Sequence, residues 1–323
     1  MRSKKNIVTL SKKVILGTVY RSTGSWYKVV AGGKIINCRI QGKLRLDNIK
    51  STNPVVVGDK VIVKEDASTA KNEGLIIQIK PRENYIVRKS VNLSKQTHII
   101  AANIDHAFLL ITFNNPTTSS LFIDRFLVTA EAYKIKSTLV FNKTDTFDSE
   151  IKSKIKEMSK IYENIGYNCI KISALKLQNI NKLNELINSK VCMFSGHSGV
   201  GKTTLINVLS PGLKLRTSSI SEQHQQGQHT TTFAEMFDLG NGAKLIDTPG
   251  IKGFGLVDME KNEISKYFPE FNKVSDKCKF KNCLHVNEPS CGVKNAIDLN
   301  EISSSRYNSY IQLLEDDKIY RNS

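Results

Sequence analysis

The chain has 323 residues, enough for two or three domains, and its 40% hydrophobic fraction is ordinary for a soluble protein. No apolar run follows residues 1–5 and no stretch approaches the ~20 apolar residues that cross a bilayer, so the sequence argues against a signal peptide or a membrane protein and predicts a cytosolic location. The net charge is +17, and residues 1–90 hold 19 Lys and Arg against 6 Asp and Glu. A lysine bias can reflect genome composition, but charge concentrated in one segment predicts a polyanionic partner, nucleic acid more than an anionic membrane.

The first part of the chain alternates short strand-like runs with glycine-containing turns. The five predicted strands are 14–20, 26–30, 34–40, 60–64 and 75–79. Five short strands in about 70 residues favour a Greek-key barrel of the OB type, a fold that binds nucleic acid through a basic groove and aromatic platforms. Tyr20, Trp26 and Tyr27 are candidate platforms, although Trp26 could equally fill the barrel core. Residues 82–97 have the composition of a linker.

From residue 107 onward, apolar strands and amphipathic helices alternate. Strands are predicted at 107–113, 137–141, 167–172, 191–195 and 244–246, and helices at 121–133, 150–165, 180–187 and 202–209. Such alternation predicts a parallel sheet covered by helices. Residues 259–323 are polar and predicted to be mostly helical.

The segment 196–203 reads Gly-His-Ser-Gly-Val-Gly-Lys-Thr and matches the P-loop pattern. Its glycines allow backbone N–H groups to point at phosphates, Lys202 reaches the β- and γ-phosphates, and the Thr203 hydroxyl ligates Mg²⁺. An apolar strand before the motif and a helix-forming run after it provide the expected context.

Three further segments follow predicted strands and complete a guanine-nucleotide site. Asp247-Thr248-Pro249-Gly250 has a carboxylate that can hold Mg²⁺, usually through water. In Asn142-Lys143-Thr144-Asp145, the last carboxylate can accept from guanine N1–H and N2–H₂, a donor pair that adenine lacks. The pair Ser173-Ala174 can support guanine O6 through a backbone N–H. The residues expected to contact the nucleotide are Asn142, Lys143, Thr144, Asp145, Ser173, Ala174, Gly196, His197, Ser198, Gly199, Val200, Gly201, Lys202, Thr203, Thr204, Asp247 and Gly250.

These motifs occur in a rotated order, because an ordinary GTPase has the P-loop first and the Asn-Lys-x-Asp segment near its end. Rotation is physically permissible, since all the motifs sit at the carboxyl ends of parallel strands around one nucleotide. It also brings Asp247 close in sequence to the C-terminal region, which suggests that nucleotide-dependent movement passes into that region.

The segment His229-Thr230-Thr231-Thr232 lies where a threonine of switch I should close over Mg²⁺ and the γ-phosphate. The pattern does not choose among the threonines, and Thr231 is the preferred candidate. Ile251 occupies the position at which Ras-like enzymes use a glutamine to orient water. His229 is therefore the candidate for that role, with Lys202 and Thr231 as the other catalytic residues.

Three cysteines and one histidine lie within fourteen residues, in the pattern Cys278-x₄-Cys283-x-His285-x₅-Cys291. Four such ligands suit a closed tetrahedral Zn²⁺ site with a structural role. The alternative is three free cysteines, which would be an unusual cluster in a cytosolic chain. Cys38, Cys169 and Cys192 are scattered and predicted to be buried.

Together these features resemble the circularly permuted, ribosome small-subunit-dependent GTPases of bacteria, the RsgA family. The resemblance covers the basic OB-like segment, the rotated motif series and the Cys/His cluster. It implies a GTPase that assists late maturation of the small ribosomal subunit, binds rRNA, is stimulated by the subunit and uses His229 in hydrolysis. Gln228 is a departure, since the family often has a basic residue there.

The predicted organisation is therefore an OB-type barrel at 1–82, a permuted α/β GTPase domain at 90–255 and a zinc-binding domain at 256–323, in a chain expected to be monomeric. The expected cofactors are GTP or GDP with Mg²⁺, and one Zn²⁺. Two alternatives remain: a P-loop enzyme that uses GTP for group transfer in metabolism or RNA modification, and an RNA-binding module with a vestigial G domain. Hydrolysis measured with each ribosomal subunit separates the three hypotheses.

Overall fold

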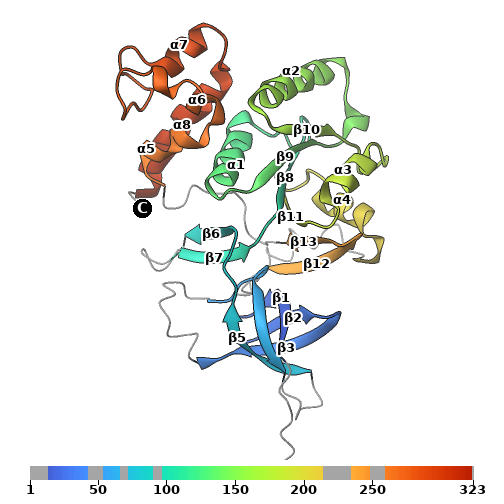
Figure 1. Ribbon diagram of the computed structural model, residues 1–323. Coiled ribbons are helices and arrows are strands. Elements are labelled where there is room, and N and C mark those ends of the chain that lie inside the picture. The colour runs from blue at the N-terminus through green and yellow to red at the C-terminus, as the bar shows by residue number, and fades with distance from the viewer. Residues whose placement is uncertain are drawn as a thin grey trace, which may run out of the picture. The chain divides into compact units, whose positions relative to one another are not determined.

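The computed structural model describes residues 14–42, 54–65, 72–89, 97–213, 234–247 and 259–321. These residues form two compact units (Figure 1). One unit holds the described residues up to Asn103 together with 234–237 and 246–247, and the other holds 104–213, 238–245 and 259–321. No described helix is long and apolar enough to cross a membrane.

The first unit contains the predicted five-stranded barrel. Its strands are β1 (Val14–Ser22), β2 (Tyr27–Ala31), β3 (Lys34–Ile40), β4 (Lys60–Glu65) and β5 (Glu73–Ile79). β1 pairs with both β2 and β4, β2 pairs with β3, and β5 pairs with both β3 and β4, so the sheet closes on itself. Alternate side chains point inward and form a core of Val19, Tyr27, Val29, Ile36, Cys38, Val61, Val63 and Ile76.

The prediction of a linker at 82–97 is wrong. β6 (Tyr85–Lys89) lies within that range and pairs with β7 (Thr97–Ala102) to form a hairpin. The Asn103 side chain donates to the Gly58 carbonyl at 2.9 Å. Arg82 donates to both oxygens of the buried Asp59 at 2.7 Å. These long-range hydrogen bonds hold the hairpin against the barrel. The composition of residues 82–97 alone could not predict them, because their partners lie elsewhere in the chain.

The second unit contains a sheet in which β10 (Asn168–Lys171), β9 (Lys136–Phe141), β8 (His106–Ile111) and β11 (Val191–Ser195) run parallel in that spatial order. Residues 243–245 of β13 (Ala243–Asp247) and 238–240 of β12 (Glu235–Gly240) follow β11 in this unit. Every residue of β8 is buried, since this strand lies between two others with helices on its faces. β12 was not among the predicted strands.

Helices cover this sheet at the predicted places. They are α1 (Ser120–Ala132), α2 (Ser149–Ile165), α3 (Ile180–Ile187) and α4 (Lys202–Leu209), with the short 3-10 helices η2 (Thr144–Thr146) and η3 (Pro211–Leu213). The Ser119 side chain accepts from the Phe122 N–H and caps α1, and Asp148 caps α2 in the same way through Ile151.

The C-terminal part of the second unit is helical, as predicted. Its elements are α5 (Lys261–Ile264), η4 (Ser265–Tyr267), α6 (Pro269–Asn272), η5 (Ser275–Lys277), α7 (Gly292–Asp298) and α8 (Ser304–Arg321). Their core contains Phe268, Phe271 and Tyr310 in mutual ring contact, aliphatic side chains around them, and Val128 of α1. α1 therefore belongs to the G domain by sequence and to the core of the C-terminal helices by packing.

A buried ion network also joins α1 to the C-terminal helices. Arg306 of α8 donates to Asp124 of α1 at 2.6 Å and to Glu270 of α6 at 2.7 Å. Tyr162 of α2 donates its hydroxyl to the same Asp124 oxygen at 2.7 Å. Burial raises the pKa of Asp124, while the Arg306 charge and these hydrogen bonds lower it.

Candidate nucleotide-binding site and metal centre

The P-loop connects β11 to α4, and its glycines are required by close neighbours. Gly196 has φ 144° and a Cβ there would lie 2.7 Å from the Leu110 carbonyl oxygen. Gly201 has φ 94° and its Cβ would lie 2.5 Å from the Asn142 side-chain nitrogen. Lys202 donates to the carbonyls of Gly196 and His197 at 2.6 and 2.7 Å. The ammonium group therefore lies over the loop, where it can meet phosphates.

Asn142 joins three nucleotide-binding segments in space: the P-loop, the Asn-Lys-x-Asp segment to which it belongs, and the Ser173-Ala174 pair. Its side-chain nitrogen donates to the Val200 carbonyl in the P-loop at 2.8 Å, and its side-chain oxygen accepts from the Ala174 N–H at 3.1 Å. The residue is buried at the end of β9. A single amide thus fixes the P-loop against the Ser173-Ala174 segment, although the partners lie 58 and 32 residues away in sequence.

The carboxylate of Asp145 is held by Ser173, whose hydroxyl donates to it. The Ser173 oxygen accepts in turn from the Lys176 N–H at 3.0 Å. The sequence indicated only a backbone role for Ser173, so its side-chain contact is an addition. This contact orients the group that the sequence assigns to base recognition.

Two residues that the sequence did not single out support the same segment. Asn115 accepts through its carbonyl from Lys143 Nζ at 2.6 Å, and Gln178 accepts from the Thr144 hydroxyl at 3.2 Å. They lie on the loops after β8 and β10, at the sheet edge where the motifs meet. Their position after predicted strands could have marked them as site residues, but asparagine and glutamine are common in any loop, so the sequence did not single them out.

His197 of the P-loop stacks on Phe122 in the first turn of α1, with ring centroids 3.9 Å apart. Burial, followed by the charge of Lys202, lowers the pKa of His197. Both effects favour the neutral imidazole beside the phosphate loop. Phe122 is another contact that the sequence pattern did not reveal, because its helical periodicity indicated only packing.

The remaining predicted site residues fall into two groups. Thr203 and Thr204 lie in the first turn of α4, and Asp247 is the last residue of β13. His229, Thr231 and Gly250 lie outside the described residues. Ser198 and Gly199 belong to the P-loop turn between β11 and α4.

Cys278, Cys283, His285 and Cys291 converge as the spacing predicted. Their ligand atoms all lie within 4.8 Å of one another. His285 Nδ1 is 3.6 Å from the Cys278 sulfur and 3.4 Å from the Cys291 sulfur. Ligands on a tetrahedral Zn²⁺ with ordinary bond lengths are about 3.5–3.8 Å apart. The cluster can therefore hold zinc with little rearrangement.

The protonation chemistry of the cluster also suits a cation. Burial and then the neighbouring thiol groups raise the pKa of Cys283 to about 12, so the chain alone does not stabilise several thiolates together. A divalent ion offsets that cost by binding the deprotonated sulfurs. Burial lowers the pKa of His285 and favours the neutral imidazole that ligates metals.

The loop around the cluster is fixed by hydrogen bonds from outside it. The Gly292 N–H donates to the Cys278 sulfur at 3.2 Å, and Tyr307 and Tyr310 of α8 donate to the carbonyls of His285 and Leu284 at 2.7 and 2.6 Å. Glu288 accepts from three backbone N–H groups of the loop. Burial alone would raise the pKa of Glu288, but these donors lower it below the usual range.

On the barrel, the three candidate aromatic platforms separate. Tyr20 and Tyr27 are buried in the core, so their assignment as platforms is wrong. Trp26 is 38% exposed, and the guanidinium of Arg39 lies 4.3 Å from its ring centroid. Trp26 is therefore a surface residue with an adjacent cation, a combination that suits base stacking.

The parallel sheet, the P-loop and the Asn-Lys-x-Asp segment that precedes it define a circularly permuted P-loop GTPase. Residues 79–257 match the family model "RsgA GTPase", and residues 16–76 match "RsgA N-terminal domain". The chain belongs to the RsgA GTPase family.

Similar proteins agree over nearly the whole length. The "Small ribosomal subunit biogenesis GTPase RsgA" of Flavobacterium psychrophilum is 58% identical over 94% of both chains, and that of Bacteroides fragilis strain YCH46 is 50% identical over 93% of this chain and 96% of its own. Among solved structures, YjeQ from Thermotoga maritima has a TM-score of 0.78 at 34% identity, covering 94% of this chain and 98% of its own. YloQ, described as a circularly permuted GTPase, has a TM-score of 0.75 at 28% identity over 99% of both.

Proposed function

We propose that this protein hydrolyses GTP to time a late step in the assembly of the small ribosomal subunit, and that it binds rRNA while doing so. The observation that carries the proposal is the side chain of Asn142, which joins the P-loop, the Asn-Lys-x-Asp segment and the Ser173-Ala174 segment into one site. Relatives that share over half of this chain's residues are named small ribosomal subunit biogenesis GTPases.

Within this proposal, Asp145 selects guanine. Its carboxylate is held by the Ser173 hydroxyl, so it is oriented before the nucleotide arrives. Adenine lacks the donor pair of guanine, so it would cover this carboxylate without donating to it, and the loss of those hydrogen bonds weakens binding. The segment 142–145 and the pair 173–174 hold the base, and the P-loop holds the phosphates.

The phosphate side of the site consists of cations and oxygen ligands. Lys202 moves from the Gly196 and His197 carbonyls to the β- and γ-phosphates. Thr203 and Asp247 would hold Mg²⁺, which, when bound, would supply positive charge against the charge that develops on the transferred group. We assign to His229 the orientation of the attacking water and to Thr231 the closure over the γ-phosphate. Gly250 would let the backbone of the second switch approach the γ-phosphate.

We assign the domains as 1–82, 90–255 and 256–323. The first grips rRNA through its basic surface, with Trp26 and Arg39 as one contact. The third holds one structural zinc ion with Cys278, Cys283, His285 and Cys291, whose separations suit tetrahedral coordination. The protein works as a monomer in the cytoplasm, where ribosomal subunits mature.

Hydrolysis assays with purified components test the proposal. We expect slow hydrolysis by the protein alone, strong stimulation by small subunits and none by large subunits, with GTP preferred over ATP. An equal response to both subunits, or to neither, would contradict the assembly role. Retention of GTP binding without any hydrolysis on the subunit would instead favour an RNA-binding module with a vestigial G domain.

A further inference from the structure

Two side chains from outside the P-loop hold it in place. The amide of Asn142, at the end of β9, donates to the Val200 carbonyl at 2.8 Å. The ring of Phe122, in the first turn of α1, stacks on the His197 imidazole with centroids 3.9 Å apart. Asn142 belongs to the Asn-Lys-x-Asp segment, whereas Phe122 belongs to none of the nucleotide-binding motifs. The stack is therefore a support of the P-loop that the motifs do not account for.

The residue under this stack also holds the P-loop lysine. The His197 carbonyl accepts from Lys202 Nζ at 2.7 Å and from the Val200 N–H at 3.4 Å. Lys202 has to leave this carbonyl in order to reach phosphates, so the backbone of His197 lies where nucleotide binding rearranges the loop. Because the Phe122 ring restricts the His197 side chain, it also restricts the positions that this backbone can take.

The helix that carries Phe122 has a fixed beginning and a rigid body. The Ser119 hydroxyl accepts from the Phe122 N–H at 3.3 Å, which caps the helix. α1 has 13 residues and is about 20 Å long. Its backbone hydrogen bonds make it a rigid element, so a displacement of the first turn is shared by the turns that follow.

The buried face of α1 is joined to the C-terminal helices by charge. Asp124 lies two residues after Phe122 and accepts from Arg306 of α8 at 2.6 Å. Arg306 also donates to both oxygens of Glu270 of α6, at 2.7 and 3.2 Å. A buried ion network does not deform gradually, because each lost contact leaves a charge without a partner. α1, α6 and α8 are therefore expected to move together.

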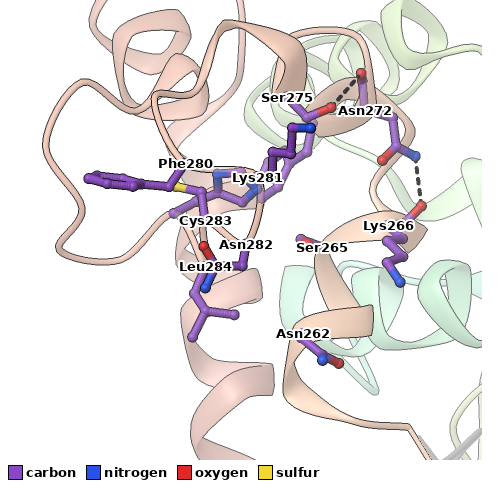
Figure 2. Close-up of a pocket in the computed structure, with 12 residues that line it drawn as sticks. Asn262, Ser265, Lys266, Asn272, Ser275, Phe280, Lys281, Asn282, Cys283 and Leu284 are labelled. Carbon is purple, nitrogen blue, oxygen red and sulfur yellow. Dashed lines mark hydrogen bonds between the residues drawn. The ribbon is translucent and has the colours of Figure 1, made fainter.

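The contacts continue from α6 to the Cys/His cluster. Phe271, the residue after Glu270, meets the His285 ring edge-on with centroids 5.9 Å apart. Both side chains line a small cavity (Figure 2), beside which the Asn272 amide donates to the Lys266 carbonyl at 2.7 Å. An unbroken series of packed residues thus leads from the P-loop to the metal-binding loop.

We propose that Phe122 positions the P-loop by holding His197, and that α1 links this position to the Arg306 network, so that nucleotide affinity and the packing of α8 depend on each other. The inference rests on the proposed function only in that the site binds GTP. It adds to that function a positioning residue outside the nucleotide-binding motifs. Because a coupling free energy is reciprocal, nucleotide must tighten α8 as much as a well-packed α8 favours nucleotide.

Equilibrium binding of a non-hydrolysable GTP analogue to the full chain tests the stack. We expect Phe122→Leu and His197→Gln to bind about three- to tenfold more weakly, the range for an aromatic pair. Phe122→Tyr keeps the ring and should bind as the wild type does.

His106→Gln is the matched control for these variants. It removes a second Phe–His stack, that of His106 on Phe108 with centroids 4.4 Å apart, at the amino end of β8. The P-loop follows the carboxyl end of the parallel strand β11, so the analogue should bind this variant normally. Wild-type affinity in Phe122→Leu, or an equal loss in His106→Gln, would overturn the positioning role.

A double-mutant cycle tests the link along α1. Arg306→Lys keeps a cation but cannot hold Glu270 by two parallel hydrogen bonds, and we expect it to weaken binding of the analogue about as much as Phe122→Leu does. The double variant should bind about as the weaker single variant does, because both changes break the same link. Thermal unfolding shows that each variant is folded at the temperature of the measurement. Losses that multiply in the double variant would overturn the link.

Amide hydrogen exchange tests the link in the opposite direction. Residues 149–158 of α2 report the general stabilisation that any bound ligand gives. On binding the analogue, we expect protection of residues 304–314 of α8 to rise more than that of 149–158, and we expect this excess to disappear in Phe122→Leu at saturating nucleotide. No excess in the wild type, or the full excess in the variant, would overturn the link.

None of these measurements needs a ribosomal subunit, so the two proposals fail in different ways. Normal binding of the analogue by the wild type with unaffected variants would refute the link alone. A wild-type chain that does not bind the analogue would refute the proposed function as well.

Discussion

Arg306 of α8 and Asp124 of α1 form a hydrogen-bonded ion pair at 2.6 Å, and both side chains are almost completely buried. Two residues before Asp124, on the same helix, Phe122 stacks on His197 of the P-loop. α1 therefore contacts the phosphate loop at its start and the C-terminal helices through its buried face. The sequence suggested that the switch beginning at Asp247 passes movement to the C-terminal region, and α1 offers a second, packed connection.

The ion pair predicts a large effect on stability when only one partner is removed. Arg306→Met leaves Asp124 and Glu270 buried without a cation, and we expect the free energy of unfolding to fall by about 3–5 kcal/mol. Denaturant unfolding measures this loss. Lys154→Ala removes an exposed ion pair with Glu150, which solvent screens, and should change the free energy of unfolding far less. A loss for Arg306→Met as small as that of the control would show that the network does not hold α8 to α1.

Asn142 should affect GTP affinity and stability together. Asn142→Ala removes two buried hydrogen bonds and leaves the Val200 carbonyl and the Ala174 N–H without a partner, so we expect about 1–3 kcal/mol less stability and weaker GTP binding. Asn142→Asp can still accept from Ala174 but faces the Val200 carbonyl with a charged oxygen, and it should be no better. Calorimetric titration of GTP and unfolding curves measure both effects. Normal GTP affinity in both variants would refute the role of this amide.

Base selection should depend on Asp145 and, through it, on Ser173. We expect Asp145→Asn to weaken GTP binding at least about 100-fold, because the amide cannot accept both guanine donors. Xanthosine triphosphate, which has a carbonyl in place of the 2-amino group, should bind the variant better than GTP does. Ser173→Ala should lose only about tenfold for GTP, since it removes the support and not the acceptor. Competition binding with GTP and xanthosine triphosphate measures both affinities. A larger loss of GTP affinity in Ser173→Ala than in Asp145→Asn would contradict the assignment of Asp145 as the base-selecting acceptor.

Removing the metal should unfold the loop around the Cys/His cluster. We expect about one zinc per chain after gentle purification, and a strong chelator or Cys283→Ser should increase amide hydrogen exchange across 278–292. Cys169→Ser is the matched control, because Cys169 is a half-buried thiol outside the cluster and its loss should leave the zinc content unchanged. Full protection of this loop after zinc removal would mean that hydrogen bonds such as those to Glu288 suffice.

His106 predicts a specific dependence of stability on pH. Burial, and then the charges of Lys190 and Lys136, lower its pKa to about 4, so the folded protein favours the neutral ring. Its contribution is therefore fully present above the unfolded pKa of about 6.5 and is lost as the pH falls toward 4. We expect a loss of about 2 kcal/mol over that range, after allowance for screening. His106→Gln, which can still hydrogen-bond to Thr138, should show a flatter curve, and parallel curves would refute the shift.

The barrel illustrates what local sequence can and cannot predict. All five barrel strands were predictable because alternation of apolar residues is a local property. Whether Tyr27 or its neighbour Trp26 faces the core was not, since adjacent side chains point to opposite faces and the register is set by the partner strands. The hairpin of β6 and β7 was missed for a related reason, because the contacts that hold it to the barrel, such as that of Asn103 with Gly58, are with residues far from it in sequence.

The sequence by itself determined the chemistry of this protein: the phosphate loop, the guanine-selecting segment, the rotated order and the four metal ligands follow from residue types and spacing. Only the tertiary structure decided how these parts depend on one another. The bridge of Asn142 between two loops, the stacking of Phe122 on His197 and the burial of Arg306 between Asp124 and Glu270 join residues that are distant in the chain. Motifs are constrained by the ligand they bind and so remain readable in sequence, whereas these contacts depend on packing geometry that folding of the whole chain creates.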